Sequence, residues 1–230
     1  MLATVIRTRV SPVDSLSPAV LAPRPHAGGS LADFDQIGTV ISVRRNEALF
    51  REGDPGRFWF RVLIGALRSS RLLPDGRRHI SGFTLPGDFV GLEDIYRFTA
   101  EAVSNATLMR YSRQTIDGLV EQQPGLGRCL LKLVCGDLDT AQSQMLLLGR
   151  KNAAEKLASF LLTMADRNGK ADRISLPMTR CDIADYLGLT TETVSRVFSQ
   201  LRSEGVITLR ASSEVGLKNR SALQALAAAA

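Results

Sequence analysis

One stretch of the chain, TRCDIADYLGLTTETVSR at residues 179–196, restricts the fold more than any other. Thr179 lies three residues before Asp182, a spacing typical of the capping box that starts a helix. Gly188 can adopt the left-handed conformation that ends this helix, and Thr190 can cap a second one. The pattern therefore predicts two short helices joined by a tight turn. Their expected ranges are 180–187 and 191–203.

The second predicted helix has one apolar and one polar face. Its apolar residues recur at i, i+3, i+4 and i+7 and should face the core: Val194, Val197, Phe198 and Leu201. The opposite face carries Glu192, Ser195 and Arg196, which combine small size with forked hydrogen-bonding groups. Such a face can enter the major groove of DNA and contact base edges. The pattern favours a helix-turn-helix motif whose second helix reads bases.

Further features separate this motif from an ordinary pair of amphipathic helices with a solvated polar face. The runs GVITL at 205–209 and EVGLK at 214–218 form a candidate β wing. Residues 149–230 hold 12 Lys and Arg against 8 Asp and Glu, a balance that suits phosphate binding. We therefore expect this region to bind DNA. The residues expected to support the motif or contact the DNA backbone are Thr179, Arg180, Thr190, Thr191 and Ser199.

A long helix is predicted before the motif. Pro124 suits the first turn of a helix, and no other proline interrupts PGLGRCLLKLVCGDLDTAQSQMLLLGRK. Small and apolar residues follow at alternating spacings of four and three: Gly127, Leu131, Val134, Leu138, Ala141, Met145 and Leu148. This a/d seam is typical of a coiled coil, so a second copy of the helix is the predicted partner. The alternative is that the stripe packs on its own barrel, and both can hold for different faces.

The region from about residue 37 to 113 has short β-type runs separated by EGDPGR, LLPDGRR and LPGDFVG. The runs RFWFRVLIGALRSSRLL and RHISGFTL are rich in β-branched, aromatic and aliphatic residues, with PDG as a hairpin connection. The spacing predicts an antiparallel barrel or jelly roll. A barrel that only packs is the simplest alternative.

Composition limits the remaining possibilities. No apolar run reaches the roughly 18 residues that indicate a membrane span. The first thirty residues are rich in Arg, Pro, Ser and Ala and predict a flexible arm rather than a targeting peptide. Cys129, Cys135 and Cys181 lack CxxC spacing, so we expect no disulfide framework and a cytoplasmic location. The predicted class is α+β. The predicted divisions are a flexible arm at 1–30, a β-roll at 31–118, a dimerisation helix at 119–149 and a winged helix-turn-helix domain at 150–230.

From Phe34 to Ala227 the chain resembles the CRP/FNR superfamily of bacterial transcription regulators, and within it FixK-type activators of the FNR/FixK branch. The segments that carry the resemblance are RRHISGFTLPGDFVGLEDIY, LLLGRKNAAEKLASFLL and MTRCDIADYLGLTTETVSRVFSQLRSEGVI. The resemblance implies a sensor-like β-roll of the cyclic-nucleotide-binding type, a long dimerisation helix and a C-terminal winged helix-turn-helix. The implied partners are a palindromic double-stranded DNA site, a second copy of the chain and RNA polymerase, in nitrogen fixation or microaerobic regulation.

In the FNR branch an E-x-x-S-R signature reads a TTGAT half-site within an inverted repeat. By resemblance, this signature falls on Glu192, Ser195 and Arg196. A carboxylate can accept from the exocyclic amine of C or A, and Arg can donate in bidentate fashion to guanine. The resemblance therefore assigns base reading to these three side chains.

The sensing features of the relatives are not found in this sequence. An iron-sulfur cluster usually needs four thiolates, and no cysteine precedes Cys129. Cyclic-AMP binding would need an Arg-Ser pair close to a Gly-Glu pair, but Leu92 separates Gly91 from Glu93 and no Arg-Ser pair follows at the matching place. His79 is the only histidine in the barrel region, which argues against haem. We predict no cofactor, no metal and activity without a bound effector, controlled by the amount of protein. The alternative is a regulator that senses an unidentified small ligand in the β-roll.

Cys181 lies in the first turn of the first motif helix, beside Arg180. The helix macrodipole and a neighbouring cation both favour the thiolate. Oxidation to a sulfinic or sulfonic acid would place negative charge near DNA phosphate, and a sulfenic group or mixed disulfide would obstruct approach. By resemblance to FixK-like proteins with a cysteine here, we predict redox control of DNA binding. The alternative is a small residue that merely fits under the turn.

An enzyme is the main rival class. The sequence has no Ser/His/Asp, metal-ligand or P-loop arrangement, and it contains only two histidines. We therefore predict that the protein is not an enzyme. A barrel that serves as an effector-binding module is the second rival, and specific DNA binding without added ligand would argue against dependence on one.

Overall fold

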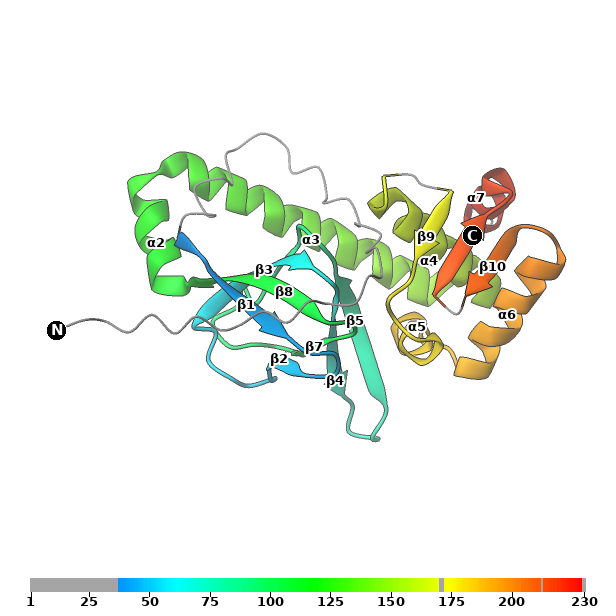
Figure 1. Cartoon of the computed structure of the whole chain (residues 1–230), viewed down its shortest axis with the longest axis horizontal. Helices are drawn as coiled ribbons and strands as arrows, with labels where there is room; N and C mark the ends of the chain where they lie inside the picture. Colours follow the sequence, from blue (N-terminus) through cyan, green and yellow to red (C-terminus); the bar gives the residue numbers. More distant parts are fainter. Residues whose placement is uncertain (1–36, 170–171, 212, 229–230) are drawn as a thin grey trace, which may run out of the picture.

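The computed structural model describes residues 37–169, 172–211 and 213–228. The predicted arm at 1–30 lies outside these residues. The chain forms an N-terminal β unit and a C-terminal unit of helices and a small sheet, with one long helix, α3 (Pro124–Arg150), running along the first and reaching the second (Figure 1). The predicted α+β class is confirmed.

The N-terminal unit consists of two four-stranded antiparallel sheets with the orders β1-β8-β3-β6 and β2-β7-β4-β5. Its strands are β1 Thr39–Val43, β2 Ala48–Phe50, β3 Phe58–Ile64, β4 Leu67–Leu72, β5 Arg78–Thr84, β6 Phe89–Val90, β7 Thr99–Ala102 and β8 Ala106–Ser112. Val62, Leu67 and Leu108 are fully buried between the sheets, which gives the roll its own apolar core. The run RFWFRVLIGALRSSRLL forms β3 and β4, which Gly65 separates at φ 87°. The predicted strands and the PDG hairpin between β4 and β5 are confirmed.

A separate helix, α2 (Arg113–Gln122), follows β8 and precedes α3. Gln123 between them has extended backbone, at φ −128° and ψ 86°, because the residue before a proline is disfavoured in the helical region. The long helix therefore begins at Pro124, the residue at which the sequence predicted its first turn. The predicted division between 118 and 119 falls inside α2.

The C-terminal unit packs helices against a three-stranded sheet of order β10-β11-β9. Its elements are α4 Ala153–Arg167, β9 Arg173–Ser175, α5 Arg180–Leu187, α6 Thr191–Ser203, β10 Ile207–Ala211, β11 Glu214–Leu217 and α7 Arg220–Ala228. The predicted wing corresponds to β10 and β11. Helix α7 was not predicted; Asn219 accepts from the backbone N–H of Ala222 at its start, and the helix packs on α4.

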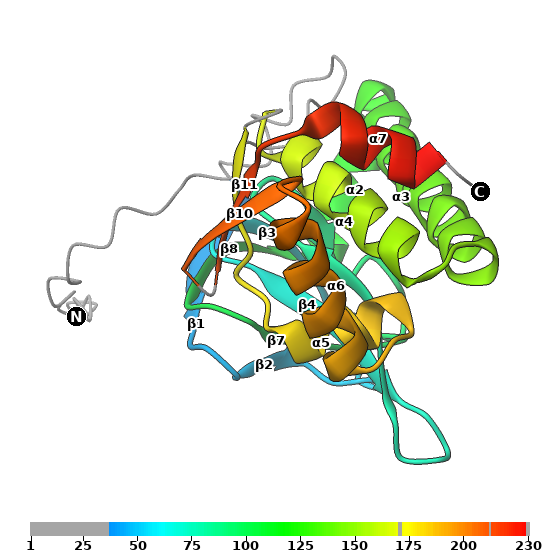
Figure 2. The same ribbon diagram turned by 90° about the vertical axis from the view of Figure 1, so that its right-hand side faces the viewer.

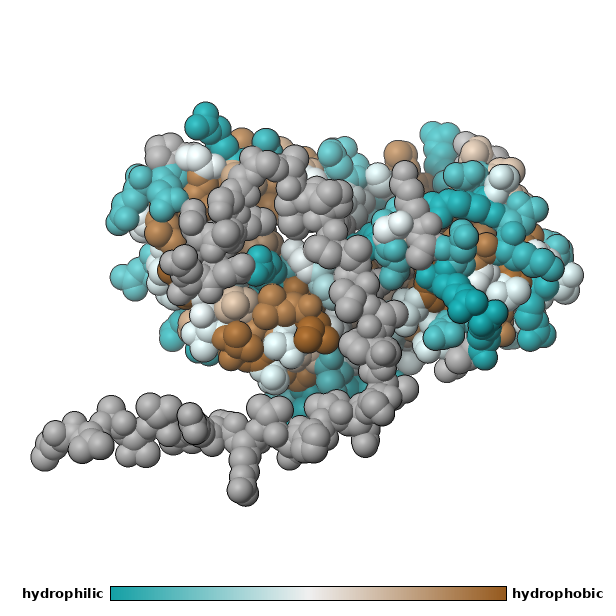
Figure 3. Space-filling view, turned by 45° about the horizontal axis from the view of Figure 1, so that its top comes forward, coloured by the Kyte–Doolittle hydropathy of each residue, from teal (hydrophilic) through white to brown (hydrophobic). Residues whose placement is uncertain are grey.

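One apolar core joins the two units. Ile80 and Phe83 of β5 belong to the same buried cluster as Phe160 of α4 and Ile183 of α5. The ring centroid of Phe83 lies 5.3 Å from that of Tyr186 on α5 and 6.4 Å from that of Phe160. The helix-turn-helix is therefore packed directly on the roll, and α6 faces outward beyond α5 (Figure 2). Hydrophilic side chains gather on the C-terminal unit, at the right of Figure 3.

Candidate nucleic-acid interface

The first motif helix starts at a reciprocal cap. The Thr179 hydroxyl accepts from the backbone N–H of Asp182 at 3.1 Å and donates to its Oδ2 at 2.7 Å, while Oδ2 accepts from the Thr179 N–H at 3.0 Å. Gly188 ends the helix in the left-handed region, at φ 62° and ψ 41°. Both local features were predicted, and the cap occupies the Thr179 hydroxyl, so this residue positions α5.

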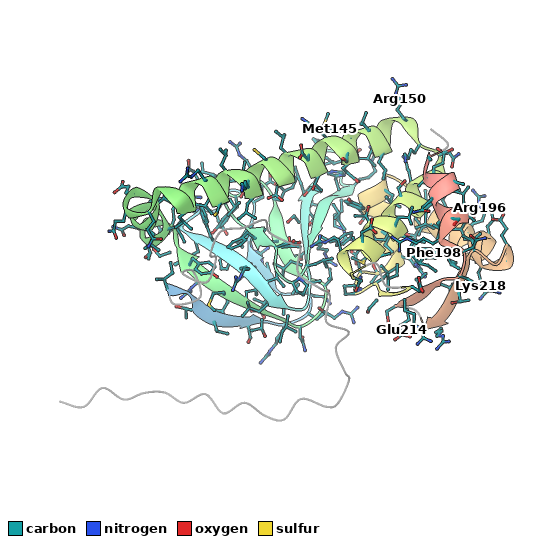
Figure 4. The ribbon with its side chains drawn as sticks, turned by 90° about the horizontal axis from the view of Figure 1, so that it is seen from above. Met145, Arg150, Arg196, Phe198, Glu214 and Lys218 are labelled. Atoms are coloured by element: carbon teal, nitrogen blue, oxygen red, sulfur yellow. The ribbon has the colours of Figure 1, made fainter. Side chains whose placement is uncertain are left out.

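The second motif helix presents the predicted polar face to solvent. Thr190 caps α6 by accepting from the Thr193 N–H at 3.1 Å. The buried residues of α6 are Val194, Val197, Phe198 and Leu201. The exposed ones include Thr191, Glu192, Ser195, Arg196 and Ser199. Figure 4 shows Arg196 at the outer surface and Phe198 inside the unit.

The polar face contains two kinds of side chain. The Ser195 hydroxyl donates to the Thr191 carbonyl at 2.8 Å, and the Ser199 hydroxyl donates to the Ser195 carbonyl at 3.0 Å. Their oxygens keep lone pairs for an incoming donor. Glu192 and Arg196 form no ion pair within the part of the chain that the structure describes, so both charged ends are available to a ligand.

The two residues at the front of α5 point to different neighbours. The Arg180 guanidinium stacks on Phe198 with 3.2 Å between its central carbon and the ring centroid, and burial lowers the pKa of Arg180 to about 10. Cys181 is exposed, and the cation beside its sulfur is Arg78 of the roll, whose Nη2 lies 3.9 Å from Sγ. The expectation that Arg180 supplies this cation is therefore corrected, because consecutive helical residues point in different directions.

A buried carboxylate links the motif to the roll. Oδ1 of Asp182 accepts from Nη1 of Arg68 at 3.1 Å and from Nη2 of Arg78 at 2.8 Å. Arg78 also donates through Nε to Asp185 at 2.7 Å. Burial on its own raises the pKa of Asp182, but the hydrogen bonds from Thr179 and the charges of the two arginines outweigh it and lower the pKa. Sequence reasoning missed this cluster, since no local pattern relates β4 and β5 to α5.

The predicted seam on α3 divides into two faces. Leu131, Leu138 and Met145, one heptad apart, are 63%, 57% and 72% exposed. Figure 4 shows Met145 on the outer side of α3, away from the roll. Val134, which is 52% exposed, and Ala141, which is also exposed, border a cavity between α3 and the roll. Leu148 lies close to the C-terminal end of α5: its Cδ2 would be 3.7 Å from a Cβ placed on Gly188. Leu148 is partly buried near α5, not against the barrel that the alternative named.

The cavity beneath α3 has a volume of about 410 Å³. Its charged lining residues are Asp88, Glu93, Asp137 and Arg167. Arg167 forms an ion pair with Asp88, so its charge is already compensated. Across the described ranges, no group of three His, Cys, Asp or Glu side chains is arranged to hold a metal ion.

Comparison with known proteins identifies the family. Residues 40–123 match the model of the cyclic nucleotide-binding domain, and residues 155–226 match that of the Crp-like helix-turn-helix domain. The nitrogen fixation regulation protein FixK of Bradyrhizobium diazoefficiens is 40% identical over 205 residues, which cover 86% of each chain. FixK of Azorhizobium caulinodans is 42% identical over 197 residues, covering 83% of this chain and 79% of that protein. The chain belongs to the CRP/FNR family, as a FixK-type member.

A solved structure supports this membership. FixK2 from Bradyrhizobium japonicum has a TM-score of 0.81 and 41% identity, covering 84% of this chain and 99% of that one. The relatives that match this chain are transcription regulators, and the chain has the family's helix-turn-helix DNA-binding domain. The predicted family, and the prediction that the protein is not an enzyme, are confirmed. Over the residues described, no helix of this FixK-type regulator is long and apolar enough to cross a membrane.

Proposed function

We propose that this FixK-type regulator binds a TTGAT-type inverted repeat as a homodimer, without a bound effector, and activates transcription from that site. The observation that carries the proposal is the exposed stripe of Glu192, Ser195 and Arg196 on α6, opposite the buried face of the same helix. A helix that is held rigidly on one side and polar on the other is suited to the major groove.

The chemistry of the stripe supports base reading. The Glu192 carboxylate can accept from the exocyclic amine of C or A, and Arg196 can donate to both N7 and O6 of guanine. Ser195 is small enough to allow close approach to a base or a thymine methyl group. Glu192 and Arg196 form no ion pair with any residue that the structure describes, so DNA binding breaks no such pair at either residue. Backbone contacts are proposed for Thr191, Ser199 and Arg180, at the edges of this surface.

The exposed line on α3 supports the homodimer. Leu131, Leu138 and Met145 occupy one a-type row, and each would be covered by the same helix of a second copy. Burial of a Leu or Met side chain contributes about 1.5 to 3 kcal/mol. A twofold dimer presents two copies of α6, which matches an inverted repeat.

Activity without an effector is supported by the packing between the units. The apolar cluster around Phe83 and the ion pairs of Asp182 already fix α5 on the roll in the free chain. The cavity beneath α3 carries an excess of acidic residues, and its Arg167 is paired with Asp88, so a cyclic phosphate would meet repulsion instead of a free cation.

A second candidate function is an effector-dependent regulator. The observation that favours it is the cavity itself, which lies between α3 and the roll and borders Val134, Ala141 and Gln144 of α3. Gln144 donates to the Tyr186 carbonyl of α5 at 3.0 Å, so a ligand that moved α3 would also act on the motif. The acidic lining suits a neutral or cationic molecule.

The names of the relatives bear on the biological role. They include nitrogen fixation regulation proteins and the transcriptional activatory protein AadR of Rhodopseudomonas palustris. We propose by this likeness a cytoplasmic activator that contacts RNA polymerase, in nitrogen fixation or microaerobic regulation. Redox inhibition through Cys181 is proposed from its exposure at the front edge of α5.

The experiment that tests the proposal is an electrophoretic shift assay with the purified, reduced, full-length protein and no added ligand. We expect one retarded dimer complex on a TTGAT inverted repeat, and much weaker binding to a single half-site or a scrambled duplex. Absence of any preference for the repeat would reject the proposed specificity. Preference that arises only after addition of a small-molecule extract would favour the effector-dependent alternative.

A further inference from the structure

We propose that Gln144 of α3 is a positioning residue: it fixes the first motif helix to the long helix and so makes the dimer select the spacing between the two halves of its DNA site. The inference rests on the proposed homodimer on an inverted repeat, and it adds a determinant of specificity that lies on α3 and not on α6. Its basis is a contact between α3 and the C-terminal end of α5.

The C-terminal end of α5 is capped by α3. The last four carbonyls of a helix have no N–H partner within the helix, and Tyr186 supplies one of them. Nε2 of Gln144 donates to this carbonyl at 3.0 Å. Leu148, one turn further along α3, lies beside Gly188, and both α3 side chains are half-buried. One face of α3 therefore holds the last turn of α5 by a hydrogen bond and an apolar contact.

Both ends of α5 are held, by different parts of the chain. At the N-terminal end, Asp182 forms ion pairs with two arginines of the roll. At the C-terminal end, the ring centroid of Tyr186 lies 5.3 Å from that of Phe83 on β5 and 5.8 Å from that of Phe160 on α4. The carbonyl of the same tyrosine is the one that Gln144 binds. The roll, α4 and α3 thus meet at one residue of the motif, so a shift of α3 would disturb the seat of α5.

The covalent connection between α3 and the C-terminal unit leaves a freedom that this contact removes. Two residues with extended backbone join α3 to α4: Lys151 at φ −95° and ψ 144°, and Asn152 at φ −75° and ψ 175°. Residues at the ends of elements absorb the dihedral changes of a hinge, whereas α3 is a continuous helix of 27 residues. Side-chain contacts such as that of Gln144 must therefore set the angle between α3 and the motif.

The same turn of α3 contributes to the proposed dimer. Met145, next in sequence to Gln144, is 72% exposed and points away from the roll (Figure 4). A second copy packed on Met145 therefore lies on the outer side of the turn whose inner side holds α5. The Gln144 contact then relates each motif to the twofold axis, and the axis relates the two copies of α6.

A motif held rigidly against α3 matches one spacing of the half-sites. One base pair changes their separation by about 3.4 Å and their relative rotation by about 34°. A motif that can tilt against α3 tolerates such a change, because the connection to α4 can follow it. Loss of the Gln144 contact should therefore weaken the selection of spacing more than the reading of bases.

The test measures, by fluorescence anisotropy, the affinity of the full-length protein for TTGAT inverted repeats that differ only in spacer length. The reference is the spacer that wild type binds most tightly, and the others are one base pair shorter or longer. Gln144→Met keeps an unbranched side chain but removes the donor. It should reduce the preference for the reference spacer by about tenfold, since two hydrogen bonds are lost per dimer. The penalty for a base change within one half-site should stay at the wild-type value.

Two further variants serve as rescue and control. Gln144→Lys should restore most of the spacer preference, because an ammonium donates to a carbonyl and is favoured at the C-terminal end of a helix. Gln142→Met makes the same replacement as Gln144→Met at an exposed position of α3 and should behave like wild type. Sedimentation velocity should show an unchanged dimer for all three variants.

Three results for Gln144→Met would overturn the inference. They are a wild-type spacer preference, equal losses of affinity on all three spacers, and dissociation of the dimer, which would place Gln144 in the dimer contact. Wild type that binds all three spacers equally, yet prefers them to scrambled DNA, would also overturn it while leaving repeat recognition intact. Wild type that prefers no repeat over scrambled DNA would instead overturn the proposed function, and the role of Gln144 with it.

Discussion

Arg78 of β5 donates through Nη2 to Oδ1 of the buried Asp182 at 2.8 Å and so connects the roll to the first helix of the DNA-binding motif. The Asp182 side chain is 2% exposed and also accepts from Arg68. Solvent screens such a buried cluster weakly, and removal of one partner leaves a charge without compensation. The Asp182 carboxylate thus adds an ionic link to the apolar contacts that orient α5 on the roll.

Replacement of Asp182 by Asn should lower the free energy of unfolding by about 2 kcal/mol at neutral pH. Because the folded pKa of Asp182 lies below its ordinary value of 3.8, its contribution is complete above that value and is lost as pH falls through the folded pKa. Denaturant unfolding should show a constant difference in the free energy of unfolding between wild type and D182N from about pH 8 to pH 5. This difference should become smaller below about pH 4.

The control for this experiment is Asp185→Asn, since Asp185 is more exposed and, among the described residues, forms an ion pair with Arg78 only. Asp185→Asn should lower the free energy of unfolding by less than D182N does at every pH. A gap for D182N that persists unchanged at pH 3 would show that the charge of Asp182 is not what stabilises the fold.

The base-reading stripe predicts a loss of discrimination. Glu192→Ala and Arg196→Ala should each reduce the preference for the TTGAT repeat over scrambled DNA by about 1 to 3 kcal/mol per contact. Gln200→Ala is the control, because Gln200 is exposed on the same helix and is engaged with Glu204 at 2.9 Å. A shift assay in which either stripe variant keeps the wild-type preference would remove that residue from base reading.

The exposed row on α3 predicts a dimer that a single charge can break. Leu138→Lys should raise the dissociation constant of the dimer by about 100-fold or more, since it places two cations in the seam. Asp139→Lys adds the same side chain at the neighbouring exposed position and should leave the dimer intact. Sedimentation velocity measures both, and dimers of equal strength would exclude this row from the interface.

The sequence predicted the elements whose signals are local. The cap formed by Thr179 and Asp182, the left-handed Gly188 and the two faces of α6 each depend on residues within a few positions, and all are observed. The start of the long helix at Pro124 had a local signal as well, because proline suits the first turn of a helix and the residue before it avoids the helical region; this start was predicted, although the division placed between 118 and 119 did not follow it.

The contacts that could not be predicted are nonlocal. Arg78 and Asp182 lie in different units, and nothing in either segment specifies the partner. Adjacency in sequence was misleading at Arg180, which stacks on Phe198 of the next helix and leaves Arg78 as the cation near Cys181. The division of the α3 seam into an outer row and a cavity-facing row similarly depends on how the roll packs under the helix.

Oxidation of Cys181 should weaken DNA binding. Its exposed sulfur lies at the front edge of α5, and a sulfinate or sulfonate there would repel DNA phosphate and compete with Asp182 for Arg78. Treatment with peroxide should reduce the affinity of wild type for the repeat by about tenfold or more, as expected for the loss of one or two phosphate contacts per dimer. Cys181→Asp should bind weakly without any oxidant.

Two variants separate this effect from general damage. Cys181→Ser should keep its affinity after the same treatment, whereas Cys135→Ser, which removes another exposed thiol on α3, should remain sensitive. Mass spectrometry of the treated proteins would establish which sulfur gained oxygen. Equal losses of DNA affinity in wild type and Cys181→Ser would exclude the redox role of Cys181. Only the Cys181 sulfur can place the new negative charge at the front of α5, so the serine variant should not respond to the oxidant.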